Sequence, residues 1–197
     1  AEDERNFLFL EFARFVKLLR PAYVLLENVS GLVSTSRGAF VREISGAITD
    51  LGYLVEARML NAADYGVPQK RERIFFVGAL PGFPIMWPAP THGYGRKQYR
   101  TVSDAISDLP PLESGESKTK YDARCQSEYQ RSMRGDCEEL RNHEAPTHPE
   151  ETVRRIAETK PGKPMYASFK QRIRLCWDAP SPTQVSGGIR PQFSFGH

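Results

Sequence analysis

Apolar residues recur along the first part of the chain with the spacing of an amphipathic helix. Between residues 3 and 19 they fall at i, i+4, i+7, i+8 and i+11, and charged residues occupy the opposite side. These apolar positions are Leu8, Phe12, Phe15, Val16 and Leu19. Pro21 ends this helix. A second helix with similar periodicity is predicted over residues 38–51, with Gly52 at its end.

Three shorter segments have the patterns of strands. Residues 23–26 form a continuous apolar run, which is typical of a strand buried on both faces of a parallel sheet. Residues 53–60 alternate between apolar and polar, and residues 74–80 form a further apolar run. The order helix, strand, helix, strand, strand predicts an α/β fold with a doubly wound sheet, seen from part-way through.

The amino-acid composition of the chain changes after the last predicted strand. Four prolines fall between residues 81 and 90, and the segment that follows is polar and rich in turns to about residue 170. Two short helices are predicted there, over residues 103–109 and 150–158. We place a domain boundary near residues 81–92, which separates a domain over residues 1–85 from a loop-rich domain over residues 86–197.

Composition excludes several classes of protein. The chain of 197 residues is 40% hydrophobic and 26% charged, which is ordinary for a soluble protein. No apolar run approaches the roughly 18 residues that a membrane helix needs, so we predict no membrane partner. The few cysteines make a reducing cytoplasm the default, and we predict a bacterial cytoplasmic or nucleoid-associated location. The three cysteines are too few and too irregular for a disulfide framework or a zinc site, so we predict free thiols and no metal. They are Cys125, Cys137 and Cys176.

The net charge of +3 comes from the second part of the chain. Residues 1–80 carry 10 basic and 10 acidic side chains, whereas residues 81–197 carry 17 and 14. Residues 159–177 hold five basic residues and no acidic one. Such a strip suits a phosphate backbone, and a solvated loop explains it equally well. Its basic residues include Arg172 and Arg174.

Charged residues stand at the ends of two predicted strands. Glu27 follows the first strand, at the edge where open α/β sheets bind ligands, so it is a candidate acid or base; a cap or turn residue is the alternative. Arg71 and Arg73 stand two residues apart before the third strand and share one face if the chain is extended. Their guanidinium groups suit a carboxylate, a phosphate or a base edge, although a solvated strand end is the plainer interpretation.

The most specific motif of the chain is a Glu-Asn-Val at a strand end, followed about 40 residues later by Gln-x-Arg-x-Arg at the start of another strand. Together with further ordered motifs, this pair resembles the C5-cytosine-specific DNA methyltransferases. The resemblance covers essentially the whole chain, although residues 93–170 match only as a variable recognition region. The matching segments are residues 3–9, 27–29, 69–73, 88–92 and 180–183.

The resemblance implies a Rossmann-like methyltransferase sheet over residues 1–85 and a target-recognition domain over residues 86–197. These enzymes flip a cytosine out of duplex DNA, a cysteine adds to its carbon 6, and carbon 5 then takes a methyl group from S-adenosylmethionine. By resemblance, Glu27 is the general acid or clamp at ring nitrogen N3. Arg73 holds the base near its O2, and Arg71 steadies the catalytic loop or a phosphate.

The resemblance also implies contacts with the cofactor and with DNA. Leu8 matches a position near S-adenosylmethionine. Together with the two arginines of the basic strip, four further residues are predicted to lie at the DNA: Gln69, Thr183, Gly187 and Gly188.

The chain also departs from the family pattern. These 197 residues contain no Pro-Cys dipeptide, which carries the family's nucleophile, and no glycine-rich cofactor loop. We therefore predict part of a modification methylase, such as a fragment or one half of a split protein, that works with a complementary chain or segment. Two alternatives stay open: a non-catalytic DNA-binding or regulatory subunit, and a tRNA cytosine-5 methyltransferase.

Overall fold

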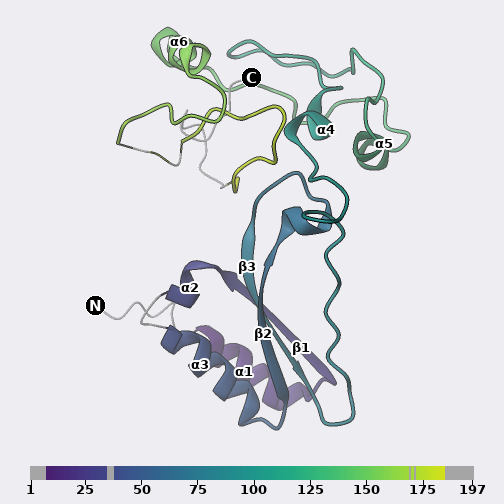
Figure 1. Cartoon of the computed structure of the whole chain (residues 1–197), viewed down its shortest axis with the longest axis vertical. Coiled ribbons are helices and arrows are strands. Elements are labelled where there is room, and N and C mark those ends of the chain that lie inside the picture. The colour runs from purple at the N-terminus through teal and green to yellow at the C-terminus, as the bar shows by residue number, and fades with distance from the viewer. Residues whose placement is uncertain (1–7, 35–37, 169, 171, 185–197) are drawn as a thin grey trace. The chain divides into compact units, whose positions relative to one another are not determined.

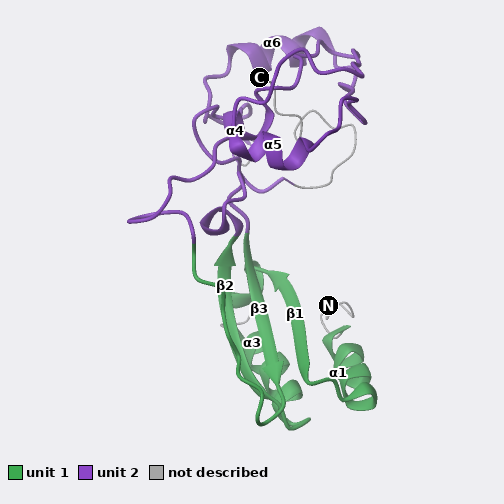
Figure 2. Ribbon diagram, turned by 90° about the vertical axis from the view of Figure 1, so that its right-hand side faces the viewer, with its two compact units in different colours: residues 1–61, 72–90 green, residues 62–71, 91–197 purple. Residues whose placement is uncertain are grey.

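The computed structural model describes residues 8–34, 38–168, 170 and 172–184 (Figure 1). The chain divides into two compact units, unit 1 with residues 1–61 and 72–90 and unit 2 with residues 62–71 and 91–197 (Figure 2). The division at residue 90 falls inside the predicted boundary segment. Loop 62–71 belongs to unit 2, although its neighbours in sequence on both sides belong to unit 1. The functional domains over residues 1–85 and 86–197 remain predictions.

Unit 1 contains helices that alternate with the strands of a small sheet. Its helices are α1 (Leu8–Leu19), the short α2 (Gly31–Ser34) and α3 (Ala39–Thr49). Its strands are β1 (Tyr23–Val29), β2 (Leu54–Asn61) and β3 (Glu72–Ala79). The predicted order of helices and strands is confirmed, except that α2 lies in a segment predicted as a loop.

The sheet has the order β1-β3-β2, and β3 is antiparallel to both of its neighbours. The prediction that the first strand is buried on both faces of a parallel sheet is therefore wrong for the described residues. Alternate residues of β1 face solvent, with Leu25 62% and Val29 52% exposed. A short apolar run has the same appearance in either kind of strand, so the pattern alone does not distinguish them.

Helices α1 and α3 cover one face of the sheet and form the core of unit 1 with it. Gly78 of β3 permits the close approach. A Cβ atom at this position would lie 2.6 Å from Val24 Cγ2 and 2.9 Å from Ile48 Cγ2. Interiors are packed closely enough that such a clash requires the backbone or its neighbours to move. The buried core residues are Val16, Val24, Ile44, Ile48, Tyr53, Ile74 and Phe76.

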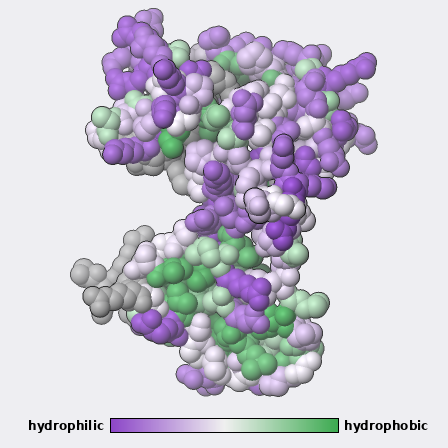
Figure 3. Space-filling view, viewed as in Figure 1, coloured by the Kyte–Doolittle hydropathy of each residue, from purple (hydrophilic) through white to green (hydrophobic). Residues whose placement is uncertain are grey.

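The segment after β3 lies along the opposite face of the sheet. The Phe83 ring meets Tyr23 edge to face at a centroid distance of 5.6 Å, and the Tyr23 hydroxyl donates to the Pro84 carbonyl at 2.9 Å. Trp87 Nε1 donates to Glu56 at 2.7 Å. Leu54 on this face is 61% exposed. Figure 3 shows hydrophobic residues gathered on the surface of unit 1.

Unit 2 is built from short helices joined by long turns. They are α4 (Val102–Ile106), α5 (Glu128–Arg134) and α6 (Glu150–Glu158). The bounds of α6 are those predicted, whereas α5 is polar and has no apolar periodicity, so the sequence did not indicate it. Helices α4 and α5 each begin with a capping box, in which a hydroxyl and the side chain three residues later satisfy each other's backbone amides.

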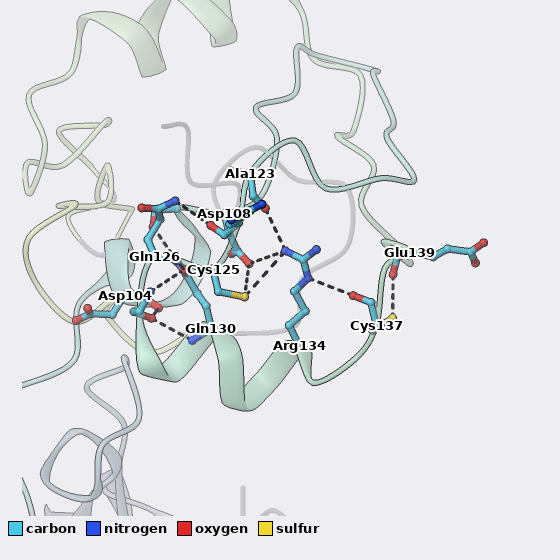
Figure 4. Close-up of polar contacts among 12 residues, drawn as sticks. Asp104, Asp108, Ala123, Cys125, Gln126, Gln130, Arg134, Cys137 and Glu139 are labelled. Atoms are coloured by element: carbon cyan, nitrogen blue, oxygen red, sulfur yellow. Dashed lines mark hydrogen bonds and ion pairs between the residues drawn. The ribbon is translucent and has the colours of Figure 1, made fainter.

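Gln130 is the buried centre of the contact between α4 and α5 (Figure 4). Its Oε1 accepts from the backbone amides of Gln126 and Ser127, and its Nε2 donates to the Ser103 carbonyl and the Ser107 hydroxyl. Both acceptor positions of the oxygen and both N–H groups of this buried amide therefore have partners.

The three cysteines are free thiols, as predicted. Cys125 donates to Asp108 at 3.8 Å, and Arg134 lies 3.7 Å from the same carboxylate (Figure 4). Within the described residues, no cluster of three or more His, Cys, Asp or Glu side chains could hold a metal ion. No helix there is both long and apolar enough to cross a membrane.

Candidate active site

The end of β1 and the start of β3 lie at the same end of the sheet because the two strands are antiparallel. In this register Val29 lies opposite Arg73 and Glu27 lies opposite Phe75. Glu27 and Arg73 are therefore diagonal neighbours on one face of the sheet, close enough for long side chains to meet. In a purely parallel arrangement, a residue at the start of β3 would lie at the other end of the sheet, away from the end of β1.

Glu27 and Arg73 form an ion pair in this position. Arg73 Nε lies 2.9 Å from Glu27 Oε1, and Arg73 Nη1 donates to the Glu72 carbonyl at 2.7 Å. The Arg73 side chain is 16% exposed, whereas that of Glu27 is 46% exposed. The arginine is thus held by two contacts, and the carboxylate at its side is open to a ligand.

The pair offers complementary chemistry to a planar ligand. A guanidinium group presents several N–H donors in a fixed plane, and a carboxyl group can accept a hydrogen bond or, when protonated, donate one. An arginine donor and a carboxyl group in direct contact can therefore address two neighbouring polar atoms of one planar ligand.

A separate group of predicted residues lies in unit 2, where loop 62–71 pairs with the segment around Ser181. Gln69 and Ser181 form a parallel bridge, and Lys70 N donates to the Ser181 carbonyl at 2.8 Å. The Thr183 hydroxyl donates to the Lys70 carbonyl at 2.8 Å, across 113 positions of sequence. Gln69 and Thr183, both predicted from the motifs to lie at the DNA, are thus brought together on one short ladder.

The arginines of the basic strip hold a local hairpin in unit 2. Backbone hydrogen bonds pair residues 162–165 with residues 172–174. Arg174 Nη1 donates to the carbonyls of Ala157 and Thr159, both at 2.8 Å, at the end of α6. The Arg172 guanidinium lies 5.5 Å from the centre of the Tyr166 ring. Both guanidinium groups therefore have intramolecular contacts, whereas Lys160 and Lys163 of the same strip are exposed.

Comparison with known proteins decides the family. The family model described as C-5 cytosine-specific DNA methylase matches residues 1–189. The chain belongs to this family. It is 34% identical over 205 residues to Type II methyltransferase M1.HphI of Haemophilus parahaemolyticus, an alignment that covers 99% of this chain and 48% of the relative. It is 37% identical over 199 residues to Type II methyltransferase M.DdeI of Desulfomicrobium norvegicum, covering 97% and 47%.

This member of the C-5 cytosine-specific DNA methylase family therefore spans about half the length of the curated relatives that it matches. Its fold is similar to a crystal structure described as a candidate DNA modification methyltransferase encoded within an E. coli prophage. That similarity has a TM-score of 0.69 at 20% sequence identity and covers 93% of this chain and 58% of the other. The expected Rossmann-like methyltransferase fold is confirmed by this likeness, although its described sheet is small and antiparallel at β3.

The remaining predicted residues of this family member are distributed as follows. Leu8 is the first residue of α1 and is 64% exposed. Arg71 is the last residue of loop 62–71 and lies just before β3, which begins at Glu72. The alternation of side chains along a strand therefore does not apply to Arg71. The expectation that the two arginines share a face remains a prediction. Gly187 and Gly188 lie outside the described residues.

Sequence reasoning missed a cluster of residues that contact loop 62–71. Asp64 accepts hydrogen bonds from residues 91 and 92 and from the Tyr99 hydroxyl, and the buried His92 ring packs on Gly66. The hydrogen bond from Tyr99 to the Asp64 carboxylate raises the pKa of Tyr99 above its ordinary value of 10.0. Two features of the sequence could have indicated this cluster. They are Gly66, since glycine tolerates the positive φ of 86° found there, and the Pro-x-Pro-Thr-His motif at residues 88–92.

Proposed function

We propose that this chain forms part of a DNA cytosine-5 methyltransferase that transfers a methyl group from S-adenosylmethionine to a flipped cytosine in duplex DNA. The contact between Arg73 and Glu27 is the observation that carries this proposal. It joins, at 2.9 Å, the two residues that the family motifs would assign to adjacent positions of one base. The relatives named as Type II methyltransferases support the role of a modification methylase.

In this proposal Arg73 donates to O2 of the flipped cytosine, and Glu27 holds or protonates N3. Both contacts withdraw electron density from the ring, so that a thiolate can add to carbon 6. Donors positioned for a developing charge of this kind typically contribute about 100- to 1,000-fold in rate. S-adenosylmethionine supplies the methyl group when it is bound, and Leu8 of α1 is proposed to lie near it.

We further propose that a complementary chain or segment supplies the nucleophile and most of the cofactor site. Two observations on unit 1 support a partner surface. In the described residues β1 has a neighbouring strand on one edge only, and strands with an open edge are ready to pair with another segment. Large apolar side chains are also exposed on α1, and exposed apolar patches mark interaction sites. They are Leu8, Leu10, Phe15, Leu18 and Leu19.

Double-stranded DNA is the proposed substrate, and unit 2 is proposed to recognise it. Gln69 and Thr183 are proposed to contact DNA from the ladder that joins them, with Gly187 and Gly188 following in the sequence. The exposed lysines of the basic strip suit the phosphate backbone better than Arg172 and Arg174, since both arginines have intramolecular contacts.

Methyl transfer tests this function directly. The chain would be mixed with a candidate N-terminal half, with duplex DNA and with S-adenosylmethionine labelled on the methyl group. We expect label at carbon 5 of cytosine in DNA, and a loss of at least 100-fold in rate for Glu27→Gln and for Arg73→Ala. Activity that is unchanged in both variants would contradict the assigned roles.

Two further arms address the alternatives. Transfer RNA is supplied as a competing acceptor, and preferential labelling of tRNA would overturn the proposal of a DNA substrate. Salt-dependent DNA binding without any methyl transfer by the combined polypeptides would favour a non-catalytic DNA-binding subunit.

A further inference from the structure

Loop 62–71 is the part of unit 2 that leads directly into the candidate active site. It begins with a short 3-10 helix over Ala62–Tyr65 and closes on itself where Ala62 N donates to the Arg71 carbonyl at 3.0 Å. Its last residue is followed immediately by Glu72 and Arg73 at the start of β3. The loop is therefore joined to Arg73 through the single residue Glu72.

The loop contacts the segment after residue 90 through the His92 ring. His92 is 8% exposed, and Gly66 has a φ of +86°. A Cβ atom on Gly66 would lie 2.7 Å from His92 Cε1 and 3.1 Å from its Nδ1. The ring therefore packs directly on the backbone of the loop at a position where only glycine fits, for reasons of both space and backbone angle.

Asp64 provides the second contact with the same segment. Its backbone carbonyl accepts from Thr91 N at 2.8 Å and from His92 N at 2.9 Å. Its carboxylate accepts from the Tyr99 hydroxyl at 2.9 Å. The other end of the loop is held by Ser181 and Thr183, so the loop is fixed at both of its ends within unit 2.

We propose that His92 and Tyr99 are positioning residues that fix loop 62–71, and that this loop couples recognition of the target by unit 2 to the placement of Arg71 and Arg73. Neither His92 nor Tyr99 acts on the base. The catalytic part of the inference rests on the proposed methyltransferase function, whereas the fixing of the loop can be tested without it.

Glycine variants provide a matched pair. Gly66→Ala introduces a clash with the His92 ring as well as a strained backbone angle. Gly95→Ala introduces similar strain at a φ of +70° in the same unit, but its Cβ would have no neighbour within 4 Å. Tyr99→Phe is a milder third variant that removes only the hydrogen bond to Asp64, and circular dichroism establishes that each variant is folded.

Hydrogen exchange of the isolated chain tests the loop itself. We expect backbone amides in peptides covering residues 62–71 to exchange at least tenfold faster in Gly66→Ala than in Gly95→Ala, with a smaller increase in Tyr99→Phe. Equal exchange in the two glycine variants would overturn the assignment of His92 as a contact that fixes the loop.

Single-turnover methyl transfer with the candidate N-terminal half tests the coupling. We expect at least tenfold slower transfer in Gly66→Ala than in Gly95→Ala when DNA is saturating, so that weaker DNA binding through Gln69 of the same loop does not contribute. A rate that excess DNA restores to that of Gly95→Ala would show an effect on binding alone and would overturn the coupling. A loosened loop with an unchanged rate would overturn the coupling. If the wild-type pair transfers no methyl group, the proposed function fails, and the exchange result still decides whether the loop is fixed.

Discussion

Arg73 Nε lies 2.9 Å from Glu27 Oε1, across the antiparallel pair of β1 and β3. The two residues are 46 positions apart in sequence and come together because the end of one strand meets the start of the other. Arg73 is the more buried partner and is held additionally by the Glu72 carbonyl. The arrangement places one donor group and one carboxyl group together on the face of the sheet opposite α1 and α3.

Arg73→Lys separates charge from geometry in the candidate active site. Lysine keeps the positive charge but loses the planar fork, so we expect methyl transfer to fall about 100-fold. The free energy of unfolding should change by less than about 1 kcal/mol, because partly exposed ion pairs contribute little. Arg58→Lys is the matched control, since Arg58 pairs with Glu56 at 3.0 Å on the same face. Equal losses of activity in both variants would count against the role of Arg73.

Gly78→Ala tests the packing of the helices on the sheet. Its Cβ would clash with Val24 and Ile48, so we expect the free energy of unfolding to fall by about 1–3 kcal/mol, the usual cost of overpacking a core. Gly46→Ala is the control, because Gly46 lies within α3 with nothing within 4 Å of its Cβ. That variant should be more stable by about 0.5–1 kcal/mol through helix propensity. Urea denaturation measures both, and destabilisation of similar size in the two variants would contradict this account.

Gln130→Ala tests the buried centre of unit 2. The substitution leaves the amides of Gln126 and Ser127 and the Ser103 carbonyl without their partner, so we expect a loss of about 2–4 kcal/mol. Gln126→Ala keeps its own backbone amide and removes only an exposed side-chain contact with Arg124. Its cost should stay below about 0.5 kcal/mol. Thermal unfolding of unit 2 compares them, and equal costs would show that burial of Gln130 is unimportant.

The stability of unit 2 should decrease on acidification because of His92. Burial of the ring, followed by the nearby charges of Arg100 and Lys97, lowers the pKa of His92 below its ordinary value of 6.5. As the pH falls, His92 therefore binds a proton in the unfolded chain before it does so in the folded chain. The contribution of His92 to the free energy of unfolding is constant well above about pH 6.5, and it decreases below that pH until the pKa of the folded state is reached. Between pH 7.5 and pH 5, the melting temperature of His92→Phe should therefore decrease less than that of the wild type. An identical pH dependence in both would contradict it.

Arg174 and Lys163 should have different roles although they lie in one basic strip. Arg174→Ala removes two hydrogen bonds from the end of α6, so we expect a loss of about 1–3 kcal/mol in stability. Lys163→Ala should leave stability within about 0.5 kcal/mol but weaken DNA binding and reduce the salt dependence of log Kd by about one unit. Fluorescence anisotropy with duplex DNA at several salt concentrations measures this. A larger change in salt dependence for Arg174→Ala than for Lys163→Ala would reverse the assignment.

Local patterns in the sequence were sufficient for much of unit 1. The apolar spacing of α1 and α3 and the runs of β1 and β3 depend only on neighbours within a few residues, so they can be found without a tertiary structure. The motif residues Glu27 and Arg73 were likewise identifiable because each stands at a strand end. In unit 2 the same method found α6 but not α5, since α5 is held by its capping box and by the burial of Gln130 rather than by an apolar stripe.

The sequence by itself therefore determined the family, the order of the helices and strands, and the residue types at the candidate active site, because these are properties of short segments. Only the tertiary structure decided that β3 runs antiparallel between β1 and β2, which brings Arg73 to Glu27. It also decided that loop 62–71 belongs with residues 91–99 and 181–183. Those contacts join positions up to 113 residues apart, and pairing over such distances depends on how the whole chain packs rather than on any local pattern.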